Sequence, residues 1–132
     1  MKIDVCFSPA LYPVYHNPEA IVVVVDVFRA TTTMAAAFSN GVRSIRPVAT
    51  VEEAEAYKAK GWLVGAERNV KRCSFADFGN SPFDYTAEKV SGKDIVFTTT
   101  NGTRAITIAK SAFRVITCLL YTSPSPRDAH ES

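Results

Sequence analysis

Two acidic residues in this chain are each followed closely by an arginine, directly after a short apolar run. Asp26 and Arg29 follow the aliphatic run 21–25. Glu67 and Arg68 follow a second apolar run later in the chain. Guanidinium groups bind phosphate or carboxylate through paired hydrogen bonds. The two pairs therefore predict a site for an anionic ligand, with carboxylates beside the guanidinium groups.

Hydroxyl, amide and glycine residues occur at equivalent positions. Threonines follow Asp26, and the stretch 98–103, TTTNGT, follows another apolar run. A helix is predicted to start after each stretch, and the unpaired amides of a helix start bind anions. A long loop around position 79 lacks helical or strand periodicity, and such loops are often functional. The residues assigned to ligand binding are Thr31, Thr32, Asn80, Ser81, Thr100, Asn101, Gly102 and Thr103.

Each candidate also has a purely structural interpretation. Asp26 can cap the helix that follows it, and Arg29 and Arg68 can form surface salt bridges. Asn80 and Ser81 precede a proline and can form a turn and a helix cap. Threonine favours strands whatever the function of a protein. The repeated arrangement at consecutive strand ends favours the functional interpretation.

The elements that must position these side chains alternate between strand and helix. Strands are predicted at 2–8, 21–25, 44–49, 62–66 and 95–100, and from 114 onward. Helices are predicted at 34–40, 51–60 and 104–110. The run 21–25 is apolar throughout, so we expect it inside a sheet with both faces covered. The alternation predicts an α/β fold whose ligand site lies beyond the carboxyl ends of a largely parallel sheet.

Three boundaries carry specific local signals. Asn40-Gly41 predicts the end of the first helix, and Thr50 with Glu53 matches a capping box at the start of the second. Pro47 lacks a backbone N–H, so the strand 44–49 should lie at the edge of the sheet or end there.

Bulk composition narrows the class of protein. The chain has 132 residues, 47% of them hydrophobic and 21% charged, and a formal net charge of +2. One domain is expected, and the charge is too small to indicate a nucleic-acid or membrane partner. No apolar run reaches the length of a membrane span and no signal-peptide pattern opens the chain, so a cytoplasmic location is expected. Three cysteines without paired spacing argue against a disulfide framework or zinc site.

The end of the chain changes character. Residues 118–128 can be written in codons that match the end of a transposon adapter used for sequencing libraries. On this interpretation the domain is 1–117, and 118–132 is a non-native, disordered tail. The alternative is a natural terminus rich in proline and serine.

Four motifs in order resemble one family. They are VVDVFRATTT at 24–33, GAERNVK at 65–71, DFGNSPF at 77–83 and TTTNGTRA at 98–105. Together they resemble the 2-phosphosulfolactate phosphatase, or ComB-like, family. The resemblance implies a three-layer α/β/α fold and Mg²⁺-dependent hydrolysis of 2-phospho-3-sulfolactate to 3-sulfolactate and phosphate, a step of coenzyme M synthesis. Family members extend about as far again beyond Thr117, so the sheet should be incomplete at its C-terminal side and this fragment inactive.

The resemblance also implies roles for the candidate residues. Asp26 and Glu67, with Asp77 as a third carboxylate, would hold Mg²⁺, and Arg29 and Arg68 would clamp the anionic groups of the substrate. Either a metal-activated water or Asp26 itself would attack phosphorus. The expected partner is a small anionic phosphate ester. Assembly of the chain with a second copy of itself as a homo-oligomer is left open. The competing hypothesis is an α/β module that binds phosphate without catalysis.

Overall fold

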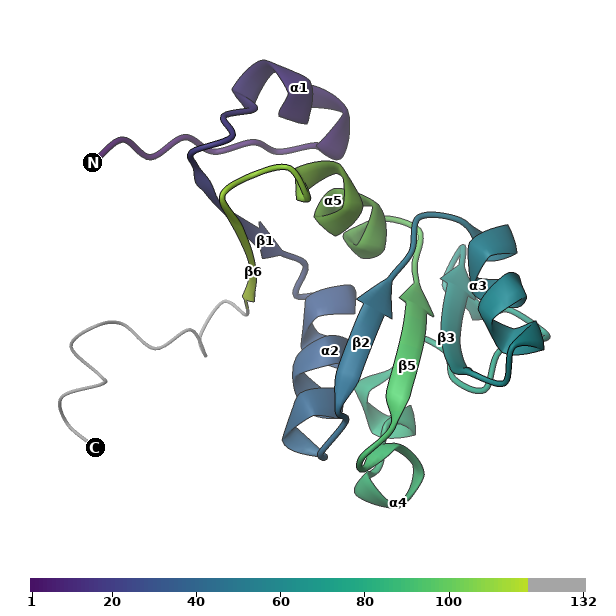
Figure 1. Cartoon of the computed structure of the whole chain (residues 1–132). Helices are drawn as coiled ribbons and strands as arrows, with labels where there is room; N and C mark the ends of the chain where they lie inside the picture. The colour runs from purple at the N-terminus through teal and green to yellow at the C-terminus, as the bar shows by residue number, and fades with distance from the viewer. Residues whose placement is uncertain (119–132) are drawn as a thin grey trace, which may run out of the picture.

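The computed structural model describes residues 1–118, in which helices and strands alternate (Figure 1). The predicted tail 118–132 lies outside the described residues apart from Cys118. The helices are η1 Pro9–Leu11, α1 Tyr12–Tyr15, α2 Ala30–Ser39, α3 Val51–Ala59, η2 Pro82–Asp84, α4 Ala87–Val90 and α5 Gly102–Ala109. The strands are β1 Ile21–Val25, β2 Ser44–Pro47, β3 Leu63–Arg68, β4 Lys71–Arg72, β5 Asp94–Thr98 and β6 Arg114–Cys118.

A four-stranded sheet forms the centre of the fold. Its strand order is β2-β5-β3-β4, with β2, β5 and β3 parallel and the short β4 antiparallel to β3. One face packs on α3, and the opposite face packs on α2, α4, α5 and the loop after Phe78. The chain is therefore an α/β protein with a mostly parallel sheet between two helical layers, as predicted.

Residues adjacent in a strand of this sheet face opposite layers. In β5, Ile95 and Phe97 belong to the core beneath α2, whereas Val96 belongs to the core beneath α3. In β3, Val64 and Ala66 likewise face α3. This is the period-two alternation of any strand, and it means that the neighbours Glu67 and Arg68 in β3 point to opposite faces of the sheet.

The three local predictions are confirmed. Helix α2 ends at Ser39 with Asn40 as its C-cap, followed by Gly41 at a φ of 85°. Thr50 and Glu53 form a capping box at α3, in which the Glu53 backbone N–H donates to Thr50 Oγ1 over 3.2 Å. Strand β2 ends at Pro47 and lies at the edge of the sheet. These features depend on residues near one another in sequence, which explains why local sequence patterns were sufficient to predict them.

A charged cluster joins the amino ends of β2 and β5. The guanidinium of Arg43 forms an ion pair with Asp94, and the Ser44 hydroxyl donates to Asp94 Oδ1 over 2.6 Å. These hydrogen bonds hold the pKa of the Asp94 carboxyl well below its usual range. The cluster lies at the opposite end of β5 from the candidate site. Asp94 is therefore a suitable control position for variants of that site.

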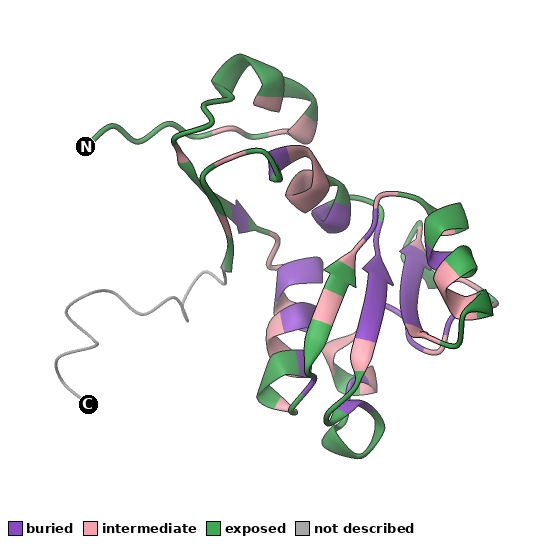
Figure 2. Ribbon diagram, viewed as in Figure 1, coloured by how far each residue is buried: buried purple, intermediate pink, exposed green. Residues whose placement is uncertain are grey.

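Two predictions about the first part of the chain are wrong. Residues 2–8 form no strand, and β1 does not join the four-stranded sheet. Within the described residues, β1 pairs only with β6, in parallel. Alternate β1 side chains, Ile21, Val23 and Val25, are more than half exposed (Figure 2).

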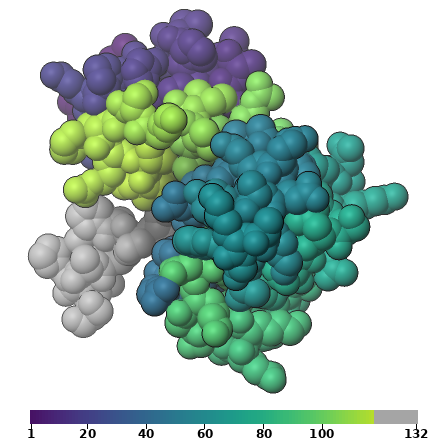
Figure 3. Space-filling model, turned by 45° about the vertical axis from the view of Figure 1, so that its right-hand side comes forward, coloured from purple at the N-terminus to yellow at the C-terminus, as the bar shows by residue number. Residues whose placement is uncertain are grey.

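The reason lies in what covers β1. Helix α5 packs against both strands of the β1–β6 pair and α2 contacts β6, whereas Val24 is the one residue of β1 that is buried. The N-terminal segment with η1 lies against α5, and in Figure 3 the purple N-terminal residues and the yellow-green residues near 100–118 lie together beside the teal middle of the chain. An all-apolar strand predicts two covering layers, but residues 1–118 leave alternate side chains of β1 exposed.

The β3–β4 hairpin turn contains a strained position. Asn69 and Val70 have φ values of 51° and 69°, in the left-handed region. A β-branched residue in this region costs about 1–2 kcal/mol, whereas glycine adopts it freely. Val70→Gly should therefore raise the free energy of unfolding by about 0.5–1 kcal/mol, measured by urea denaturation. Val5→Gly, at an exposed residue with ordinary φ, is the matched control, and destabilisation by Val70→Gly would contradict the argument.

Candidate active site

Helices α2 and α5 begin close together, and Asp26 lies beside their first residues. A Cβ added to Gly102, which starts α5, would collide with the Cβ of Ala30, which starts α2, and would lie 2.8 Å from Asp26 Oδ2. Asp26 is half-buried, and its carboxylate accepts no hydrogen bond from residues 1–118. Helix starts carry unpaired amides and a partial positive charge, so this position suits an anion or a cation-bound anion.

The threonines after Asp26 shape the turn that presents it. Thr31 Oγ1 donates to the Asp26 carbonyl over 2.8 Å and accepts from the Asp26 N–H over 3.0 Å. Thr32 Oγ1 donates to the Val27 carbonyl over 2.7 Å. Both hydroxyls, predicted to bind ligand, thus bind the backbone of the β1–α2 turn.

The start of α5 is fixed by a reciprocal pair of buried threonines. The Thr103 N–H donates to Thr99 Oγ1 over 3.2 Å, and the Thr99 N–H donates to Thr103 Oγ1 over 2.8 Å. Asn101 is the N-cap residue, is exposed, and makes no capping hydrogen bond with its side chain. Thr103 therefore positions the helix, whereas the Asn101 amide is open to solvent.

Glu67 lies on the same side of the sheet and contacts the turn before α5. Its Oε1 accepts from the Val70 N–H over 2.6 Å and from Thr100 Oγ1 over 3.0 Å. Its Oε2 lies 3.4 Å from the Thr100 backbone N–H. Glu67 is only 6% exposed, so this carboxylate is buried and used by its neighbours.

Arg68 points to the other face of the sheet, because it is the next residue along β3. Its guanidinium donates to Thr98 Oγ1 over 2.8 Å, to the Glu67 carbonyl over 2.6 Å and to the Ala49 carbonyl over 3.2 Å. Arg68 therefore ties together the carboxyl ends of β3 and β5 and the segment before α3. The structure does not bring its side chain to the side on which Asp26 and Glu67 lie.

The loop that carries Asn80 reaches the site beside β3. Phe78 bridges Gly65 in parallel, so the residues after Phe78 run toward the carboxyl end of β3. Thr33 Oγ1 of α2 donates to the Asn80 carbonyl over 3.2 Å. Asn80 is 8% exposed, and its Oδ1 is buried without a hydrogen-bond partner in the described part of the chain. Ser81 is the N-cap of η2 but makes no capping bond with its side chain.

Tyr85 fixes this loop and was not singled out from the sequence. Its hydroxyl donates to the Gly79 carbonyl over 2.7 Å. Burial, and then the Asp84 carboxylate, raise the pKa of the Tyr85 hydroxyl, which keeps it a donor. The missed signal was Gly65, a glycine in a buried strand. A Cβ at Gly65 would collide with the Tyr85 hydroxyl and lie 2.7 Å from the Phe97 ring.

Asp77 lies at the other end of β3. Its Oδ1 is 2.5 Å from Lys58 Nζ, and its Oδ2 accepts from the Val64 N–H over 2.9 Å. Because Val64 is near the amino end of β3 and Glu67 near the carboxyl end, the structure does not bring Asp77 to the other candidate carboxylates. Its interactions tie the end of α3 to the start of β3.

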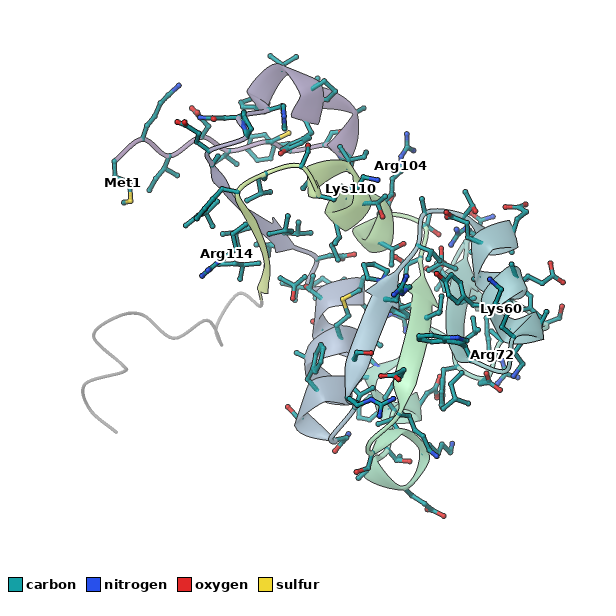
Figure 4. All side chains as sticks on the ribbon, viewed as in Figure 1. Met1, Lys60, Arg72, Arg104, Lys110 and Arg114 are labelled. Carbon is teal, nitrogen blue, oxygen red and sulfur yellow. The ribbon has the colours of Figure 1, made fainter. Side chains whose placement is uncertain are left out.

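The remaining basic residues are dispersed. Arg29 is half-buried at the N-cap of α2, and its guanidinium makes no hydrogen bond or ion pair within residues 1–118. The labelled side chains of Lys60, Arg72, Arg104 and Arg114 are exposed and come from separate parts of the fold (Figure 4). In the part of the chain that the structure describes, no helix is long and apolar enough to cross a membrane.

Residues 1–118 contain no group of three or more His, Cys, Asp or Glu side chains that could hold a metal ion. Mg²⁺ requires fewer than three protein ligands, because it takes one or two carboxylates and fills its other coordination positions with water and phosphate. Among residues 1–118, the Asp26 carboxylate has no hydrogen-bond partner, and Asn80 Oδ1 is a buried oxygen without one. Oxygen donors of these two kinds are ones that Mg²⁺ takes, with water and phosphate in its other positions.

Comparison with known proteins gives consistent matches. A family model described as 2-phosphosulpholactate phosphatase matches residues 6–123. Proteins named probable 2-phosphosulfolactate phosphatase are similar to the chain. One from Thermotoga petrophila is 51% identical over 64% of this chain and 37% of its own length. Others, from Caldanaerobacter subterraneus subsp. tengcongensis and Clostridium beijerinckii, are 44% and 39% identical over 83% and 87% of this chain. These two matches cover 47% and 50% of the relatives, so the chain spans about half their length or less.

Proposed function

This chain belongs to the 2-phosphosulpholactate phosphatase family, and we propose on that premise that the full-length protein hydrolyses 2-phospho-3-sulfolactate to 3-sulfolactate and phosphate with Mg²⁺. The full-length protein means a family member of the relatives' length that contains these residues. The supporting observation is the position of Asp26 where α2 and α5 begin, beside Gly102. The reaction would serve as a step of coenzyme M synthesis, as the resemblance implies.

The residues of this chain act mainly by binding negative charge. The substrate carries a phosphate, a sulfonate and a carboxylate, and its transferred phosphoryl group spreads charge over three oxygens as it reacts. Amides at the first turns of α2 and α5 donate to such oxygens. The Arg29 guanidinium, which is half-buried and has no ion-pair partner among residues 1–118, supplies a second anion-binding group.

Asp26 and the side-chain oxygen of Asn80 are the groups proposed to hold Mg²⁺. When bound, the ion polarises a phosphoryl oxygen and lowers the pKa of water. The Thr31 and Thr32 hydroxyls keep the Asp26 turn in place through their bonds to the backbone. Thr99 and Thr103 do the same for the start of α5.

Removal of magnesium tests this proposal. Phosphate release from 2-phospho-3-sulfolactate by the full-length protein should fall to background when the ion is chelated, and should return when Mg²⁺ is restored. Ca²⁺ is the matched control, because it is larger and takes six to eight ligands. Phosphate binding without metal-dependent turnover would instead support the alternative, an α/β module that binds anions without catalysis.

The proposal assigns turnover to the full-length protein and none to the 132 residues alone. Asp26 follows β1, which pairs only with β6 among the described residues and leaves alternate side chains exposed. Because β1 is incompletely covered, it holds Asp26 less rigidly, and the site is poorly preorganised for catalysis. Assaying the 132-residue chain beside the full-length protein tests this, and thermal unfolding of the chain shows whether it folds cooperatively. Equal turnover numbers would contradict it.

A further inference from the structure

Glu67 is the most fully engaged carboxylate of the site. It is 6% exposed and accepts hydrogen bonds from the Val70 N–H and the Thr100 hydroxyl, with the Thr100 N–H 3.4 Å away. A carboxylate has about four acceptor positions on its two oxygens, and three of them are directed at protein donors here. Asp26, in contrast, has no such donors among the described residues. The two acids of the site therefore have different chemical environments.

The donors to Glu67 come from two different turns. Val70 belongs to the β3–β4 hairpin turn, and Thr100 belongs to the turn between β5 and α5. Thr100 Oγ1 also accepts from the Asn69 N–H over 3.2 Å, so it links the hairpin turn to Glu67. Glu67 and Thr100 thus form one small network that holds both turns together.

This network ends two residues before the start of α5. Gly102, which follows Thr100 and Asn101, is the residue that lies against Ala30 and Asp26. Any shift of Thr100 moves the amides of the first turn of α5 relative to Asp26. A misplacement of about 1 Å at such a position costs an enzyme about a hundredfold in rate.

We propose that Glu67 is a positioning residue that acts through Thr100 to hold the start of α5 against Asp26, and that it does not bind the metal ion. The inference rests on the proposed function for its site. A carboxylate is required because the groups around it are all donors. Glutamine would direct an NH₂ group at one or more of them and would leave a partly buried donor unpaired.

A double-mutant cycle tests this assignment in the full-length protein. The variants are Glu67→Gln, Thr100→Val and the double variant. For each, kcat/KM, the Mg²⁺ concentration for half-maximal rate, and the affinity for inorganic phosphate by calorimetry are measured. Each single variant should lose about tenfold in kcat/KM and in phosphate affinity, and the double variant should lose no more than Glu67→Gln alone. The half-maximal Mg²⁺ concentration should remain within about twofold of the wild type.

The opposite results would overturn the proposal. One such result is that Glu67→Gln raises the half-maximal Mg²⁺ concentration at least about tenfold while Thr100→Val behaves as wild type. The other is that the losses in kcat/KM and phosphate affinity multiply in the double variant. Asp94→Asn is the control for a general loss of stability, because Asp94 is hydrogen-bonded at the far end of β5. It should leave phosphate affinity unchanged.

Hydrogen exchange supplies a readout that does not depend on turnover. In Glu67→Gln, the amides of Val70 and Thr100 should exchange at least about tenfold faster, while those of β2 stay protected. Unchanged exchange at Thr100 would overturn the positioning role even if the substrate were different. A wild type that binds phosphate but does not hydrolyse 2-phospho-3-sulfolactate would contradict the proposed function alone.

Discussion

Asp26→Asn in the full-length protein is expected to lower kcat/KM for 2-phospho-3-sulfolactate by about three orders of magnitude. The change keeps the shape of the side chain and removes its charge. The Asp26 carboxylate accepts no hydrogen bond from residues 1–118, so the change breaks none, and only its favourable charge at two helix starts is lost. The free energy of unfolding should therefore fall by no more than about 1 kcal/mol.

Steady-state assays and urea denaturation on the same samples measure both effects. Glu55→Gln is the matched control, since Glu55 is an exposed carboxylate in α3. It should change neither quantity. If Asp26→Asn and the wild type hydrolyse the substrate at equal rates, the assignment of Asp26 is incorrect. A single turnover in isotopically labelled water separates the two chemical routes, because label in the Asp26 carboxylate requires Asp26 to be the nucleophile.

Gly102→Ala is expected to impair both folding and catalysis. The new Cβ would collide with the Cβ of Ala30 and lie 2.8 Å from Asp26 Oδ2, so α2 and α5 must separate. Overpacking of this kind costs about 1–3 kcal/mol, and displacement of the α5 amides from Asp26 should lower kcat/KM by at least about a hundredfold. Urea denaturation and steady-state kinetics of the full-length protein measure the two losses.

Gly61→Ala supplies the matched control for this prediction. Gly61 has a φ of 86°, but a Cβ there meets nothing within 4 Å. Alanine should therefore cost about 1 kcal/mol of stability through the backbone alone, with wild-type kcat/KM. Wild-type kcat/KM in Gly102→Ala would show that the close approach of the two helices has no part in catalysis.

Residues near one another in the sequence were sufficient to predict much of this structure. The Thr50–Glu53 capping box, the C-cap of α2 at Asn40 and the strand that ends at Pro47 were all confirmed. Each depends on hydrogen bonds or dihedral preferences within a few residues. The order of strands and helices, and hence the α/β class, depends on the same local patterns.

Family membership was also readable from the sequence. The four motifs predicted the family that the comparisons identify over residues 6–123. Short motifs in a fixed order are properties of the chain itself, so no knowledge of the fold was needed to find them. The positions and partners of their side chains are a separate matter.

Glu67 and Arg68 illustrate what the motifs left undecided. Both were predicted to contact the ligand, but neighbours in a strand face opposite sides of the sheet. Glu67 bonds Thr100 beside the start of α5, and Arg68 bonds Thr98 and Ala49 on the side of α3. Alternation implies that they point apart, but which face holds the site depends on the layer that packs on each.

Tertiary structure alone decided which distant groups meet. Asp77 lies beside Lys58, Asp26 beside Gly102, and β1 beside β6, although none of these pairs is close in sequence. Contacts of this kind depend on strand order, on register and on the burial that each layer gains, and these are properties of the whole chain. The sequence by itself determined the elements and the chemical groups at their ends, whereas packing decided which groups share a site, because side chains far apart in the chain meet only after the layers close.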